Sequence, residues 1–74
     1  MSIKFKIGDY FIYLWSPFRE IGIITEIRKH NNSYWFFYKV IYSNTIKYSS
    51  FTMNSYMYET AKIISKEEAF LEIL

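Results

Sequence analysis

Hydrophobic positions recur along most of the chain in short runs with the period of two that is typical of β-strands, and polar segments separate the runs. This pattern predicts five strands. We expect them at about residues 9–15, 21–29, 34–42, 45–50 and 60–64. The third strand has the strongest pattern, and one of its faces carries Tyr34, Phe36, Tyr38, Val40 and Tyr42.

Turn-forming residues lie between the predicted strands. Residues 16–20 hold the only proline, which fixes φ and lacks a ladder donor, so this segment is predicted to be a loop. Residues 30–33 have the sequence His-Asn-Asn-Ser and predict a tight hairpin, because asparagine tolerates positive φ. Ser43 and Asn44 predict a second tight turn. Residues 51–58 are expected to form a looser stretch with a single helical turn.

The predicted strand at residues 21–29 changes character along its length. Strict alternation gives one face with Ile21, Ile23, Thr25 and Ile27 and another with Gly22, Ile24, Glu26 and Arg28. The second face turns from apolar to charged, which indicates that it leaves the core near Glu26. Gly22 has no Cβ, so it indicates a bulge or a close backbone approach.

The C-terminal residues 65–74 have a helical pattern instead. Ser65 and Glu68 form a capping box, in which each side chain satisfies a backbone donor at the start of a helix. An apolar stripe at helical spacing follows, made of Ala69, Phe70, Ile73 and Leu74. A helix of about ten residues does not persist alone in water. We therefore expect it to dock on the strands of its own domain, with another molecule as the alternative.

The sequence Gly8-Asp9 and the run from Gly22 to Ile27 resemble the KOW and Tudor group of SH3-like barrels. A narrower resemblance is to the RNA-polymerase-interacting domain of CarD-like transcription regulators, from which the chain departs at residues 15–20 and 51–53. Small SH3-like proteins encoded by bacteriophages share the same skeleton. The resemblance implies a binding module, with a partner in transcription or another nucleic-acid-handling machine.

Together these patterns predict one mainly β domain over residues 1–74. It is expected to be a five-stranded SH3-like barrel of the KOW/Tudor type at residues 5–64, with a short C-terminal α-helix at residues 65–74. A chain of 74 residues lies near the lower size at which a core holds itself together. Without cysteine, it forms no disulfide.

The composition changes this picture in one respect. Aromatic residues make up 23% of the chain, which is more than a barrel of this size can enclose, so some are predicted to form a contact face on the surface. The net charge of +2 is too small to imply a nucleic-acid partner by itself. No signal peptide or membrane-spanning run is apparent, so we expect a cytoplasmic protein, in the host cytoplasm if it is encoded by a phage.

Catalytic chemistry is not predicted. His30 is the only histidine and falls in a predicted turn, and Asp9 is expected to cap the turn after Gly8. No residue spacing suits a zinc site or a phosphate-binding glycine loop. We therefore expect no enzymatic activity, no cofactor and no metal.

Three classes of function remain open. For protein binding, the candidate residues are Trp15, Phe18, Arg19, Tyr34 and Trp35, since Trp and Arg are frequent interface anchors. For direct nucleic-acid binding they are Arg28, Lys29, Lys39, Lys47 and Tyr48, with the two later lysines expected to meet across a hairpin. The third class is a structural or assembly subunit of a larger particle. The partner and the oligomeric state are left open by the sequence.

Overall fold

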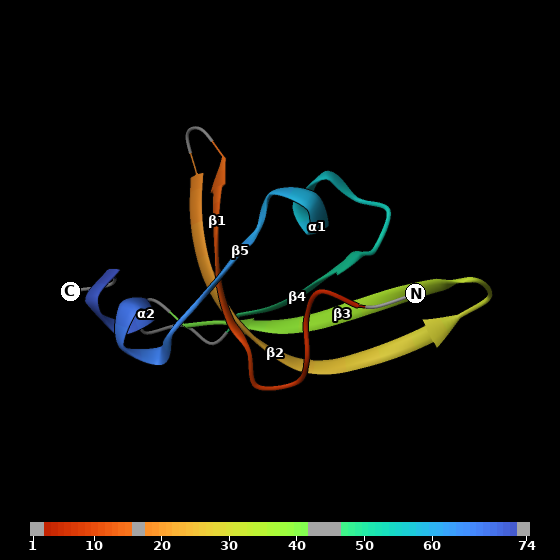
Figure 1. Ribbon diagram of the computed structural model, residues 1–74, viewed down its shortest axis with the longest axis horizontal. Helices are drawn as coiled ribbons and strands as arrows, with labels where there is room; N and C mark the ends of the chain where they lie inside the picture. Colours follow the sequence, from red (N-terminus) through yellow and green to blue (C-terminus); the bar gives the residue numbers. More distant parts are fainter. Residues whose placement is uncertain (1–2, 16–17, 42–46, 73–74) are drawn as a thin grey trace.

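The computed structural model describes residues 3–15, 18–41 and 47–72. In these residues the protein forms one five-stranded sheet and two short helices (Figure 1). The elements in chain order are β1 (Tyr10–Trp15), β2 (Phe18–His30), β3 (Ser33–Val40), β4 (Lys47–Thr52), α1 (Tyr56–Thr60), β5 (Lys62–Ile64) and α2 (Lys66–Glu72). The strands lie in the order β4-β3-β2-β1-β5, and every pairing is antiparallel.

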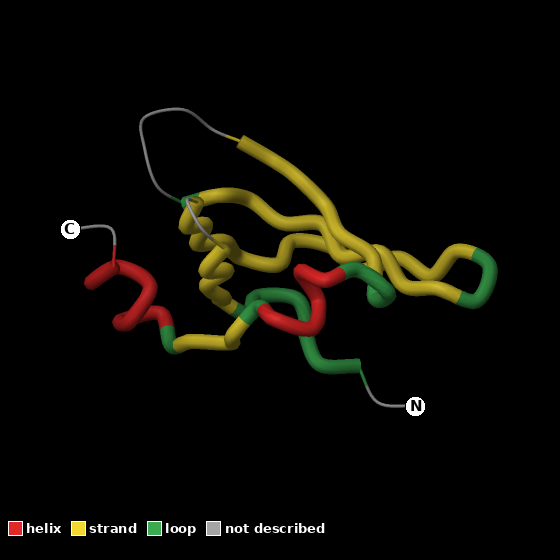
Figure 2. Tube along the Cα trace, turned by 90° about the horizontal axis from the view of Figure 1, so that it is seen from above, coloured by secondary structure: helices red, strands yellow, loops and turns green. Residues whose placement is uncertain are grey.

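The mainly β fold with a short C-terminal helix is confirmed, but the closed barrel is not seen. The edge strands of the sheet are β4 and β5. No pairing joins them within the described residues, so the sheet is open. The connecting helix α1 packs Met57 and Tyr58 against the core instead of closing the ladder. The β2–β3 hairpin extends beyond both helices (Figure 2).

Several predicted boundaries were wrong. Residues 18–20 were assigned to a loop, but Phe18 pairs with Trp15 and Glu20 with Tyr13, so they belong to β2. Proline restricts its own conformation and that of the residue before it, which leaves the following residues free to pair. The structure also ends β3 at Val40, moves β4 two residues later and places the helical turn at α1. The predicted turn at residues 43–44 lies outside the described residues.

A β-bulge in β2 changes which side chains face the core. Ile24 pairs with Tyr38 and Glu26 with Phe37, which leaves Thr25 without a partner residue on β3. The Thr25 hydroxyl donates to the Phe37 carbonyl at 3.2 Å. An extra residue reverses the alternation beyond it. Strict alternation was therefore wrong for this strand, and the bulge lies three residues beyond the glycine that was expected to mark it.

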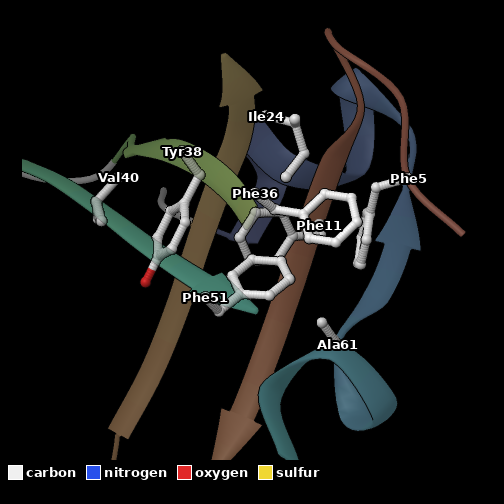
Figure 3. Packing of buried hydrophobic residues seen from close by; sticks show 8 residues of the cluster. All are labelled: Phe5, Phe11, Ile24, Phe36, Tyr38, Val40, Phe51 and Ala61. Atoms are coloured by element: carbon white, nitrogen blue, oxygen red, sulfur yellow. The ribbon is translucent and has the colours of Figure 1, made fainter. Parts of the chain in front are cut away.

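Hydrophobic side chains pack on both faces of the sheet. We call the larger cluster the aromatic core, and it contains Phe5, Phe11, Ile24, Phe36, Tyr38, Val40, Phe51 and Ala61 (Figure 3). Its rings interlock, mostly edge to face, with centroids 5.1–5.8 Å apart for pairs such as Phe11–Tyr38 and Phe11–Phe51. The smaller cluster lies under α2 and contains Ile12, Ile21, Ile64 and Ala69.

The C-terminal helix docks on its own domain as expected, although the strands beneath it form an open sheet and not the expected barrel. Ala69 of α2 is fully buried in the smaller cluster, and the Phe70 ring lies 6.2 Å from that of Tyr10. Leu71 remains 69% exposed. The last two residues of the predicted stripe, Ile73 and Leu74, lie outside the described residues.

Two local predictions about polar side chains are also confirmed. Asp9 caps the turn after Gly8, because its Oδ2 accepts from the Lys6 backbone N–H at 3.0 Å and its own N–H donates to the Lys6 carbonyl at 3.1 Å. Gly8 has a φ of 96°, which a residue with a Cβ rarely adopts. At the start of α2, the backbone N–H of Ser65 donates to Glu68 Oε1 and that of Glu68 donates to Ser65 Oγ, both at 3.1 Å.

This capping box leads to a prediction. The Ser65→Ala variant is expected to lose about 1 kcal/mol of unfolding free energy, because a backbone donor of α2 loses its acceptor. The hydrogen bond from the Ser65 N–H, and then the Ser65 hydroxyl, lower the pKa of Glu68. A lowered folded-state pKa gives stability that is present above the ordinary glutamate pKa and is lost as pH falls through the lowered one. Urea unfolding at neutral and acid pH measures both effects.

The matched control is Glu68→Gln, which keeps a capping acceptor but does not titrate. As pH falls, the free energy of unfolding of this variant is expected to decrease less than that of the unchanged chain, because Glu68 no longer titrates. If Ser65→Ala unfolds at the same urea concentration as the unchanged chain, the box contributes nothing to the fold.

Candidate binding surface

The described residues offer no group of three or more His, Cys, Asp or Glu side chains that could hold a metal ion. His30 is exposed at the end of β2. Among the described helices, none is long and apolar enough to cross a membrane.

An exposed sheet surface lies opposite the aromatic core. Because Phe36, Tyr38 and Val40 point into that core, their neighbours on β3 point the other way. The bulge turns side chains in the second half of β2 to this same side. The β4 side chains that stand opposite these β3 residues also lie on it. We call this surface the outer face, and it comprises Glu26, Arg28, His30, Trp35, Phe37, Lys39, Tyr48, Ser50 and Thr52.

A hollow lies at the hairpin end of the outer face. It has a volume of about 240 Å³ and is lined by Arg28, His30, Trp35 and Phe37. The Arg28 guanidinium carbon lies 5.4 Å from the centre of the Phe37 ring, a cation–π distance, and Arg28 also forms an ion pair with Glu26. Trp35 stands opposite Arg28 in the ladder and is 38% exposed. The hollow therefore combines aromatic rings with a guanidinium group.

The outer face continues onto β4. There each large side chain on one strand stands opposite a smaller or more polar one on the other strand. Tyr48 is 66% exposed and stands opposite Lys39. Ser50 stands opposite Phe37, and Thr52 opposite Trp35. β4 therefore places small side chains beside both rings.

The structure does not bring the predicted protein-binding residues together. Trp35 lies on the outer face, but Tyr34 lies on the opposite face, where it packs against the aromatic core with Lys29 Nζ 5.9 Å from its ring. The backbones of Trp15, Phe18 and Arg19 lie at the other end of β2, in the β1–β2 hairpin (Figure 1). Their side chains lie outside the described part of the protein.

The predicted nucleic-acid-binding residues divide between the two faces. Arg28, Lys39 and Tyr48 lie on the outer face, whereas Lys29 and Lys47 lie on the other. The expected meeting of the two later lysines was wrong, because the register sets Lys39 opposite Tyr48 and shifts Lys47 by one residue. A shift of one residue in a strand places a side chain on the opposite face.

The side chains of two lysines, Lys47 and Lys4, contact other groups of the protein. Lys47 Nζ lies 3.4 Å from Glu20 Oε2, and the other oxygen of that carboxylate accepts from the Tyr38 hydroxyl at 2.6 Å. Lys4 Nζ donates to the carbonyls of Tyr58 and Ala61 at the end of α1. These contacts engage both ammonium groups, so the two lysines are poor candidates for binding a ligand.

Sequence reasoning missed two residues of the hollow, Phe37 and His30. Phe37 had a signal, because it is two residues from Trp35 and so shares its face in a regular strand. His30 is two residues from Arg28 but was predicted to lie in a turn, and its position beside Trp35 depends on the bulge at Thr25.

Comparison with protein-family models, curated proteins and solved structures found no match to this chain. Its function is therefore inferred from its own residues.

Proposed function

We propose that this chain is a non-enzymatic protein-binding module that contacts its partner through the outer face. The observation that carries the proposal is an exposed tryptophan, Trp35, beside Arg28 on an open sheet face. Aromatic residues and arginine are enriched at protein interfaces and supply most of their hot spots. The surrounding polar side chains suit the rim of such an interface.

The proposal includes the SH3-like character of the fold. The bulged and bent β2 and the pairing of β5 with β1 support a partly open barrel of this kind. The resemblance to the KOW and Tudor group and to CarD-like regulators extends the proposal to a partner in transcription or another nucleic-acid-handling machine.

Direct nucleic-acid binding is the second candidate, because Arg28, Lys39 and Tyr48 share the outer face with Trp35. Base stacking on exposed rings contributes about 1–3 kcal/mol per base. However, Arg28 is paired with Glu26, and Lys29 and Lys47 lie on the other side of the sheet. Few cations therefore remain for phosphates, and the protein-binding function is favoured.

Affinity capture from the native lysate tests this proposal. After nuclease treatment, the unchanged chain is expected to retain a defined protein. The Trp35→Ala variant is expected to bind it about 30-fold more weakly or worse, since losing a hot spot removes about 2 kcal/mol or more. The matched control is Tyr56→Ala, which removes a 61% exposed ring from α1 and is expected to bind normally.

Two results would contradict the proposal. Equal capture by Trp35→Ala and Tyr56→Ala would exclude the outer face as the contact. Loss of all captured material on nuclease treatment, with an affinity that falls steeply with salt, would instead support direct contacts with phosphates.

A further inference from the structure

The free edge of β4 presents backbone groups without partners. The Met53 N–H donates to the Tyr34 carbonyl at 3.0 Å, so the backbone of Met53 points toward β3. The backbone N–H and C=O groups of successive residues point to opposite sides of an antiparallel strand. Those of Tyr48 and Ser50, at an odd number of residues from Met53, therefore point away from β3. They have no hydrogen-bond partner among the described residues. Among the described residues, two backbone donors and two acceptors of this edge therefore have no partner.

This edge lacks most of the features that protect a strand from pairing. Natural sheets protect edge strands with proline, bulges, inward-pointing charges or very short strands. The pairing of β4 with β3 is continuous over six residues without a bulge, and the strand has no proline. Its one charged side chain, Lys47, lies on the aromatic-core side at the first position of the strand and forms an ion pair with Glu20, so it protects only that end of the edge. By contrast, the opposite edge strand β5 has only three residues.

The side chains beside this edge would select what pairs with it. An added strand would lie about 5 Å from β4, with alternate side chains on the outer face. A side chain beside Ser50 or Thr52 would meet little obstruction and reach toward Phe37 and Trp35. A side chain two residues away would lie beside Tyr48, near Lys39.

The charges favour an acidic occupant. Lys39 has no ion-pair partner among the described residues, and neither β3 nor β4 contains an acidic residue. A second copy of this chain would bring its own Lys39 to the edge and no acidic side chain from β3 or β4, and like charges across an interface disfavour association. A segment that carries a carboxylate complements the edge better.

We propose that β4 binds an extended segment of the partner protein as an additional strand. The segment has an acidic side chain near Lys39 and, two residues away, a large apolar side chain that packs over Ser50 toward Phe37 and Trp35. Main-chain hydrogen bonds to Tyr48 and Ser50 supply affinity, and the two side chains supply specificity. This inference rests on the proposed protein-binding function and specifies its geometry.

The probe is an array of short synthetic peptides in which one Glu and one Leu, Phe or Trp are held two residues apart in an extended, Thr- and Val-rich background. The full chain is expected to bind a subset of them, and replacing Glu by Lys in those peptides weakens binding at least about tenfold. N-methylation of alternate peptide amides tests the backbone contacts directly. In an added strand, every second amide faces β4 and the others face away. N-methylation of the first set is expected to abolish binding, and N-methylation of the second set to preserve it.

A variant of the protein gives an independent test. Ser50→Pro removes an N–H that points away from β3, so it blocks the edge while leaving the β3 ladder intact. It is expected to lose the peptides, whereas Ser50→Ala retains them. Amide spectra show whether both variants fold. If Ser50→Pro does not fold, the N-methylated peptides still test the inference on the unchanged chain.

The outcomes separate this inference from the proposed function. Peptides that bind equally well with either set of amides methylated overturn strand addition but leave protein binding intact. An array without any bound peptide also overturns strand addition, while Trp35-dependent capture still tests the broader function. Binding of single-stranded oligothymidine in place of peptides, with a steep salt dependence, overturns both. Self-association that Ser50→Pro abolishes would assign the edge to a second copy and overturn the inference.

Discussion

Replacement of Phe36 by alanine is expected to lower the free energy of unfolding by about 3–5 kcal/mol, the usual range for removing a buried Phe side chain. Phe36 is fully buried. Its ring stacks on those of Phe51 and Tyr58, with centroids 5.4 and 5.2 Å away, and meets the edge of Phe5 at 5.7 Å. The substitution therefore removes contacts among β3, β4, α1 and the N-terminal segment together.

Urea unfolding of the full chain measures this loss. Small domains are stable by only about 5–15 kcal/mol, so the variant is expected to unfold at low urea or to be largely unfolded without it. Tyr48→Ala is the control, since it removes an exposed ring from the same sheet and is expected to change stability by no more than about 0.5 kcal/mol. Similar losses in both variants would show that Phe36 is not central to the core.

The Gly22→Ala variant is expected to lose about 1–3 kcal/mol through overpacking. A Cβ at Gly22 would lie 2.7 Å from Tyr38 Cδ2 and 3.0 Å from two ring carbons of Phe11. Both rings are constrained, because Phe11 is fully buried and the Tyr38 hydroxyl donates a hydrogen bond to Glu20 Oε1. Urea unfolding again measures the change.

A second substitution tests whether crowding is the cause. Tyr38→Leu removes the ring that the new Cβ would meet, so Gly22→Ala is expected to be less damaging in that background. Strictly additive losses would contradict the steric explanation and would point to the backbone preference of glycine instead.

The sequence predicted features that depend on neighbouring residues. The hairpin at residues 30–33 forms as expected, and Asn31 adopts a positive φ of 57°. Asp9 and the Ser65–Glu68 pair make the predicted caps because each bond spans only three residues. Such features are set by local chemistry, so a single sequence reveals them.

Features that depend on register were not predictable in this way. The bulge at Thr25 puts Arg28 and His30 beside Trp35, and no residue type announces it. A register offset of one residue sends Lys39 and Lys47 to opposite faces. Whether β4 and β5 meet depends on the bend of the whole sheet. The outer face is therefore a product of strand pairing, which local patterns do not specify.

The most direct test of the binding surface is a titration of the ¹⁵N-labelled full chain with the tightest-binding acidic peptide, followed by amide chemical shifts. We expect the largest changes at the Trp35 indole and the backbone amides of Tyr48 and Ser50, with those of α2 unchanged. Changes confined to α2 or to the aromatic-core side of the sheet would contradict the assignment of the outer face and the β4 edge as the binding surface.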